Sequence, residues 1–243
     1  MHIWQADVML HPVAVTEPVR PTDLTGPGWA LVDNGAVTAG GRGDALVMLN
    51  HDEIARRAEH GLGAVTNYAL LGALLNLPLA TPVRMRTLSV HDMVILGEAP
   101  PGVIDVDEAG WVTRRLAAPL TVAAAVVEGT GWRNITRRAA RFLPFCQQIA
   151  LFPCAPRGFS SVAWEASFAG IGVWIRDGED ITEAVCARPY VRRFWKAAGW
   201  EFQEIAYREH LKATRPAVLS GGPAGRRART MRAAFDPRQL SLL

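Results

Sequence analysis

The sequence predicts an α/β back half, preceded by an α+β front half and followed by a basic, flexible tail. The continuous apolar run "LTVAAAVVE" at 120–128 is typical of a central strand that is covered on both faces. Helical and strand-like segments then alternate with short connections, which favours a parallel sheet with right-handed crossovers. After Arg215 the composition shifts to Pro, Gly and Arg, as expected of a segment that does not pack. These observations divide the chain at 1–115, 116–215 and 216–243.

The front half combines strands that pair in antiparallel fashion with two helices. The alternating pattern of 2–10 predicts a strand, and the Pro- and Gly-rich stretch that follows predicts a hairpin turn at Asn34-Gly35. Helix start and stop signals predict the first helix, with Asp52 near its start and Gly61 at its end. The remaining expected elements are a strand at 44–50, helices at 51–61 and 64–77, a strand at 92–96, and a strand and turn across 103–114.

The back half has the order βαβαβ, with a further strand as a hairpin return. The run at 120–128 is the first strand, and an amphipathic pattern at 132–146 predicts the first helix, with Ile135, Phe142 and Phe145 facing the sheet. The elements expected after it are a strand at 147–154, a helix at 160–170, a strand at 171–178, a return strand at 180–189 and a terminal helix within 190–212, broken at Gly199.

Composition excludes some classes of protein. The chain has 26 Lys and Arg against 23 Asp and Glu, a formal charge of +3 that gives only a weak bias towards an acidic partner. Cys146, Cys154 and Cys186 show no CxxC spacing, so they predict neither a zinc site nor an even disulfide framework. The first residues lack the features of a signal peptide, and the apolar run at 70–80 is too short to span a bilayer. We therefore expect a cytoplasmic protein with no membrane segment.

The stretch "VVEGTGWRNITRRAARFLPFCQQIALFP", together with "AWEASFAGIGVWIRDG", resembles the PD-(D/E)XK nuclease superfamily in the order and length of its elements. There a strand ends in Glu-x-Lys, the next helix carries basic residues, and a further helix and strand follow. The resemblance covers less than a quarter of the chain and implies a restriction-endonuclease-like back half. The sequence departs from the pattern at Thr130, which stands where the superfamily has its lysine.

The resemblance also implies a chemistry. In that superfamily an upstream aspartate and the strand-end glutamate hold Mg²⁺, and the lysine positions or polarises the attacking water. Here Asp105 or Asp107 could be the upstream acid, with Glu128 as the second catalytic and metal-binding carboxylate. Because Thr130 cannot supply the positive charge, we expect weak cleavage or none, and a cofactor, Mg²⁺, only if the protein is active. An equally good reading of Glu128 is an acid that favours the dipole of the following helix.

Basic residues form clusters that suit phosphate. In the first predicted helix of the back half, three arginines recur at a spacing of four residues and so share one face. Two further clusters lie at 192–196, where tryptophans are interleaved, and in the tail. The alternatives are solvated charged faces and, for the tryptophans, core packing. The residues expected to bind nucleic acid are Arg133, Arg137, Arg138, Arg141, Arg192, Arg193, Lys196, Arg226, Arg227 and Arg229.

The front half carries a second resemblance. "RMRTLSVHDMVIL" followed by "VIDVDEAGWVTR" is similar to the YodL-like domain of phage and plasmid proteins. His91 stands where that pattern has glycine. The residues that keep the pattern are Arg86, Leu88, Ser89, Val90, Asp92, Val94, Gly110 and Trp111. This resemblance implies a mobile-element context rather than a reaction.

Together these observations predict a nucleic-acid-binding protein on a degenerate nuclease-like fold, with DNA or RNA as its partner. One alternative is an active Mg²⁺-dependent nuclease. Another is an assembly or adaptor protein that acts through a protein partner, because Trp and Arg enrichment fits a protein interface as well as nucleic acid.

Overall fold

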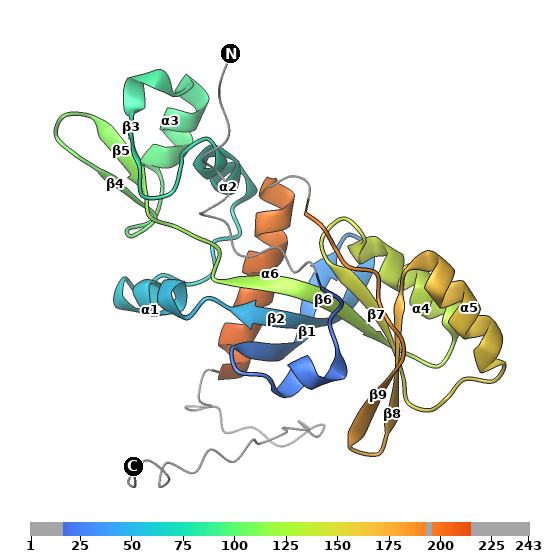
Figure 1. The fold of residues 1–243 in the computed structure, drawn as a ribbon. Coiled ribbons are helices and arrows are strands. Elements are labelled where there is room, and N and C mark those ends of the chain that lie inside the picture. The colour runs from blue at the N-terminus through green and yellow to red at the C-terminus, as the bar shows by residue number, and fades with distance from the viewer. Residues whose placement is uncertain (1–16, 193–195, 215–243) are drawn as a thin grey trace, which may run out of the picture.

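The structure, a computed structural model, describes residues 17–192 and 196–214. Its main feature is a mixed sheet of six strands (Figure 1). The middle pairs β6–β7 and β7–β8 are parallel, whereas β1–β2, β2–β6 and β8–β9 are antiparallel. In spatial order the strands are β1 (Trp29–Thr38), β2 (Gly41–Leu49), β6 (Leu120–Glu128), β7 (Gln147–Phe152), β8 (Gly172–Asp177) and β9 (Asp180–Val185).

The predicted βαβαβ unit is confirmed. After β6 come α4 (Trp132–Ala139), a short 3-10 helix at Ala140–Phe142, β7, α5 (Phe159–Ala169) and β8. Every residue of β6 except its last is buried, which agrees with an apolar strand between two neighbours. The terminal Glu128 is exposed, because the strand ends there. The apolar run thus makes β6 an interior strand of the sheet.

Three helices, α4, α5 and α6, pack on one face of the large sheet. Side chains of α4, α5 and α6 (Ala197–Thr214) pack with Val122, Ala125 and Val127 of β6 in one core cluster, and the register shift opposite Leu46 and Val47 moves the alternation by one residue after Val122. The intervening residues of β6 belong to a second cluster on the opposite face, which includes Val19 near the short 3-10 helix at Pro21–Thr25. Because side chains alternate along a strand, one apolar run supplies both cores.

A smaller lobe lies between β2 and β6 in the sequence and beyond the start of β6 in space (Figure 1). Its sheet has the order β3–β5–β4 and is wholly antiparallel. Trp200 of α6 completes the core of this lobe, whereas Phe202 belongs to the core of the large sheet. The lobe comprises α2 (Tyr68–Leu75), β3 (Pro82–Arg84), a 3-10 turn (Met85–Thr87), α3 (Val90–Gly97), β4 (Ile104–Val106) and β5 (Trp111–Arg114), and α1 (His51–Glu59) precedes it.

The predicted boundary at residue 115 runs through the large sheet, because β2, which pairs with β1, also pairs with β6. A fully buried ion network adds to this connection. Arg57 of α1 donates through both terminal nitrogens to Glu204 of α6, at 2.8 and 2.7 Å. Glu204 also accepts from the backbone N–H of Val65, and Arg57 donates to the carbonyl oxygen of Ala117. The segments that enter and leave the small lobe are therefore tied to the helix that covers the large sheet.

The hairpin prediction at Asn34-Gly35 is wrong. These residues lie inside β1 at a register shift between Val32 and Ala36, and the turn that leads to β2 is at Ala39–Gly40. Gly40 has φ +87, the left-handed conformation that a tight turn needs. Gly35 serves packing instead, since an added Cβ would lie 2.9 Å from the Cβ of Val32.

The strand prediction at 92–96 is also wrong, because these residues belong to α3. Ser89 caps this helix: its Oγ accepts from the backbone N–H of Asp92 at 3.0 Å and donates to the Asp92 carboxylate at 2.9 Å. The first N–H groups of a helix have no partner within the helix, and this Ser-x-x-Asp arrangement supplies one. The cap at Ser89 therefore outweighs the strand preference of the β-branched residues in this segment.

Other expectations differ in extent. The helix expected at 64–77 begins only at Tyr68, after the cap residue Asn67, and the helix expected at 132–146 ends at Ala139. Gly199 does not break the terminal helix, because it lies in the first turn of α6. The strand expected at 2–10 and the tail at 216–243 lie outside the described residues.

Candidate functional site

Glu128 stands at the carboxyl end of β6 and its carboxylate already has a cationic partner. Its Oε1 accepts from Nη1 of Arg176, in β8, at 3.0 Å. Both side chains are partly exposed, so the pair lies at the carboxyl ends of the parallel strands rather than in the core. An arginine two strands away therefore balances the strand-end charge.

Asp44 of β2 is the second carboxylate at this edge. It pairs with Val126, two residues before Glu128, so the two acids lie on the same face of neighbouring strands. One oxygen of Asp44 accepts from the backbone N–H of Asn34 at 2.9 Å. Burial, followed by the negative charges of Asp33 and Glu128, raises the pKa of Asp44 above its ordinary value.

The structure does not bring Asp105 or Asp107 to Glu128. Asp105 is in β4 of the small sheet and its Oδ2 accepts from Nε of Arg115 at 2.6 Å. Asp107 accepts from the backbone N–H of Trp111 and so closes the β4–β5 turn. Figure 1 shows β4 beyond the start of β6, whereas Glu128 ends that strand. Within 17–192 and 196–214, no group of three or more His, Cys, Asp or Glu side chains could hold a metal ion.

The arginines of α4 and of the 3-10 helix that follows it (Ala140–Phe142) divide into an inner and an outer set. Arg138 is half-buried and donates to the carbonyl oxygens of Glu128, at 3.1 Å, and Arg42, at 3.0 Å, so it fastens the helix to the sheet. Ile135 and Ala139 face the core, as predicted for the apolar side of this helix. The outer set, which we call the arginine row, consists of Arg133, Arg137 and Arg141, all exposed.

The arginine row carries uncompensated charge. Arg137 donates to the side chain of Asn134 at 3.4 Å, and Arg141 lies against the backbone of the β1–β2 turn. Among residues 17–192 and 196–214, none of the three forms a salt bridge with a carboxylate. The row therefore presents three positive charges to solvent along one side of a helix.

The other predicted basic clusters contribute less. Arg192 is half-buried, and its Nη2 donates to the side-chain oxygen of Gln203 at 2.8 Å in the amide orientation that satisfies both groups. Burial lowers the pKa of its guanidinium. Lys196 is exposed, whereas Trp200 is fully buried and belongs to the core. Outside the described residues lie Arg193, Arg226, Arg227 and Arg229.

Two exposed aromatic residues were missed by reasoning from the sequence. Trp164 and Phe168 of α5 are 71% and 78% exposed, and their rings stack with centroids 6.0 Å apart and an interplanar angle of 8°. The signal was present as aromatic residues four positions apart, with Val162 and Ala166 on the other side of the helix. Next to this pair, Trp132 of α4 donates from Nε1 to the Glu165 carboxylate at 2.7 Å and joins the two helices.

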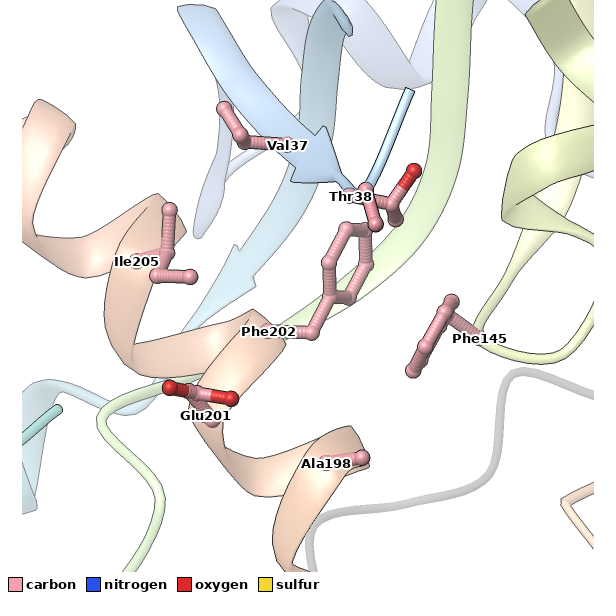
Figure 2. A pocket seen from close by; sticks show the side chains of 8 residues that line it. Val37, Thr38, Phe145, Ala198, Glu201, Phe202 and Ile205 are labelled. Atoms are coloured by element: carbon pink, nitrogen blue, oxygen red, sulfur yellow. The ribbon is translucent and has the colours of Figure 1, made fainter. Parts of the chain in front are cut away.

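A hollow that lies elsewhere in the fold does not suit phosphate. Figure 2 shows it between the end of β1, Phe145 and the first turns of α6. Its volume is about 240 Å³, and no basic residue lines it. Glu201 is its one carboxylate, and the buried hydroxyl of Thr38 has no hydrogen-bond partner among the described residues. This pocket shares no residue with the arginine row or with the Asp44–Glu128 edge.

The chain matches no protein-family model, no curated protein and no solved structure. No helix in the described part of the chain has the length and apolar character needed to cross a bilayer.

Proposed function

We propose that the chain is a nucleic-acid-binding protein built on a restriction-endonuclease-like fold that has lost efficient cleavage. The observation that carries this proposal is the arginine row, Arg133, Arg137 and Arg141, which is exposed and free of salt bridges among the described residues. Arginine binds phosphate oxygens through two parallel N–H donors, so a row of three fits a phosphate backbone. The surface holds positive charge that nothing in the described fold uses.

The nuclease-like part of the proposal is supported by the parallel βαβαβ unit with a glutamate at the end of its first strand. Asp44 lies upstream in the sequence and beside Glu128, which is the relation that the resemblance implied for Asp105 or Asp107. The chemistry, in contrast, is impaired in two ways. Thr130 stands in place of the lysine. The carboxylate of Glu128 already forms a salt bridge with Arg176, with 3.0 Å between Oε1 and Nη1.

An active Mg²⁺-dependent nuclease is the second candidate, because Asp44 and Glu128 are hard oxygen ligands on one face of two paired strands. Asp44 and Glu128 would hold Mg²⁺, which would supply at this end of the strands the positive charge that Arg176 now places against Glu128. Loss of one preorganised stabilising group costs on the order of 10²–10³-fold in rate, so the absent lysine predicts at most slow cleavage.

The test compares cleavage and binding on the same preparations. Labelled single-stranded and duplex DNA and RNA are incubated with Mg²⁺ and with the wild type, Glu128→Gln or Asp44→Asn. We expect binding at low salt and the same background cleavage in all three proteins. Fast Mg²⁺-dependent cleavage that disappears in both variants would replace the proposal with the active nuclease. No binding to any of the nucleic acids at low salt would reject it in favour of the assembly or adaptor protein.

A further inference from the structure

The outer side of α5 carries two large aromatic side chains, where a helix on a protein surface is normally polar. Val162 and Ala166 face the core, and the residues opposite them are Trp164 and Phe168. Large aromatic side chains this exposed mark a binding surface more often than a random solvent contact, because a contiguous apolar patch is costly to hydrate. Their nearly parallel rings already stack on each other in the free protein.

The aromatic pair and the arginine row belong to one surface. Helices α4 and α5 pack on the same face of the sheet and lie side by side (Figure 1). The hydrogen bond from Trp132 to Glu165 spans the seam between them at 2.7 Å. Since the core-facing residues of both helices point to the sheet, their opposite sides face solvent in the same direction. We call the five outward residues, Arg133, Arg137, Arg141, Trp164 and Phe168, the α4–α5 surface.

Charge decides what kind of ligand fits this surface. The arginine row has no salt bridge among the described residues, and the nearby carboxylate of Glu165 is engaged by Trp132. An occupant must therefore offer negative charge beside flat apolar groups. Single-stranded nucleic acid offers both, because its bases are free to stack on aromatic rings while its phosphates bind arginine. In a duplex the bases already stack on one another, and stacking on the protein would require unstacking them.

We propose that the α4–α5 surface binds single-stranded nucleic acid, with bases stacked on Trp164 and Phe168 and the phosphates on the arginine row. The inference deepens the proposed function and rests on it. It goes beyond phosphate binding alone, because it predicts a preference for unpaired strands and assigns that preference to the two aromatic residues. The stacking is tolerant of sequence, since every base has an apolar face.

The test uses fluorescein-labelled oligothymidylate and oligouridylate of about 20 nucleotides and a duplex of the same length, which exceeds the ~4–16 nucleotides of one typical binding site. Fluorescence anisotropy measures the Kd of each probe for the full chain. Trp164→Ala/Phe168→Ala is expected to weaken binding of the single strands by about 10-fold or more, the effect of losing at least one stacked base. The conservative Trp164→Phe/Phe168→Tyr variant keeps both rings and should retain most of the affinity.

Matched controls separate this surface from general effects. Tyr68→Ala removes an exposed aromatic residue from the small lobe, and Arg86→Ala removes an exposed arginine there. Neither should change the Kd, and circular dichroism and thermal unfolding should show that all variants fold, because the substituted side chains are exposed. The two single-stranded probes report whether DNA or RNA is preferred.

The possible outcomes distinguish the inference from the proposed function. Loss of single-strand binding in the aromatic double variant, with binding retained in the conservative one, supports the inference. Unchanged single-strand binding in the aromatic double variant, or tighter binding of the duplex by the wild type, overturns it and leaves the proposed function intact. No binding of any probe by the wild type overturns both, and the α4–α5 surface then fits a protein partner better.

Discussion

The buried pair Arg57–Glu204 gives a prediction whose size follows from its contacts. Arg57 is fully buried and donates to Glu204, Glu53 and two backbone carbonyl groups, and it stacks over the ring of Tyr207 with 5.2 Å to the centroid. Despite burial, the ion pairs with Glu204 and Glu53 raise the pKa of Arg57, so it stays charged. Replacing it with methionine keeps the volume of the stem but leaves Glu204 buried with only two N–H donors, from Val65 and Trp200.

Breaking a buried pair from one side costs about 3–5 kcal/mol, and we expect Arg57→Met to lower the free energy of unfolding by this amount. Glu204→Gln should cost less, because Glu53 still balances the charge of Arg57 and the amide oxygen still accepts. In the double variant Arg57→Met/Glu204→Gln, the loss should be smaller than the sum of the two single losses.

Urea unfolding of the four proteins, followed by circular dichroism, measures these differences as a double-mutant cycle. The wild type should unfold in one transition, because the network joins the segments on both sides of the small lobe. If Arg57→Met lost less than about 1 kcal/mol, or less than Glu204→Gln, Arg57 would not be compensating the buried charge of Glu204 as we infer.

Three further predictions concern the end of the sheet at which Asp44 and Glu128 lie. Gly43→Ala should destabilise the fold by about 1–3 kcal/mol in urea unfolding, because its Cβ would lie 2.6 Å from the carbonyl oxygen of Val126; an unchanged midpoint would contradict that contact. Glu128→Gln should lower the pKa of Asp44 in an NMR titration, since burial and then the charges of Asp33 and Glu128 hold it up, and an unmoved pKa would show that the two acids do not interact. The pKa of Asp44 is raised in the folded protein, so the folded state loses stability as the pH rises from the ordinary value of 3.8 through the folded pKa. Asp44→Asn should remove this pH-dependent loss of stability in thermal unfolding.

The strongest local patterns could be read from the sequence. The unbroken apolar run of β6 admits one interpretation, and the spacing of Arg133, Arg137 and Arg141 against Ile135 places the arginines away from the core. These features depend on neighbours within one element. Helix α3 was wrongly predicted as a strand, because its β-branched residues favour a strand and only the cap at Ser89 favours a helix.

Relations between distant segments could not be read in the same way. Asp44 meets Glu128 only because β2 pairs with β6 in a register with a shift between Leu46 and Val47, and that register depends on packing across the whole sheet. The resemblance implies only an acid upstream of Glu128, a condition that Asp105, Asp107 and Asp44 all meet in the sequence. The exposure of Trp164 depends on which side of α5 the sheet covers, and the sequence of the helix alone does not determine that.

If the arginine row neutralises phosphates, the salt dependence of nucleic-acid binding must depend on its three side chains. The slope of log K against log salt is roughly −0.7 per phosphate neutralised on a single strand and −0.9 on a duplex. Arg133→Ala/Arg137→Ala/Arg141→Ala, measured by anisotropy beside the wild type and Arg86→Ala at several salt concentrations, should flatten the slope by about two to three units at unchanged thermal stability. A slope equal to that of the wild type in the triple variant would contradict the account.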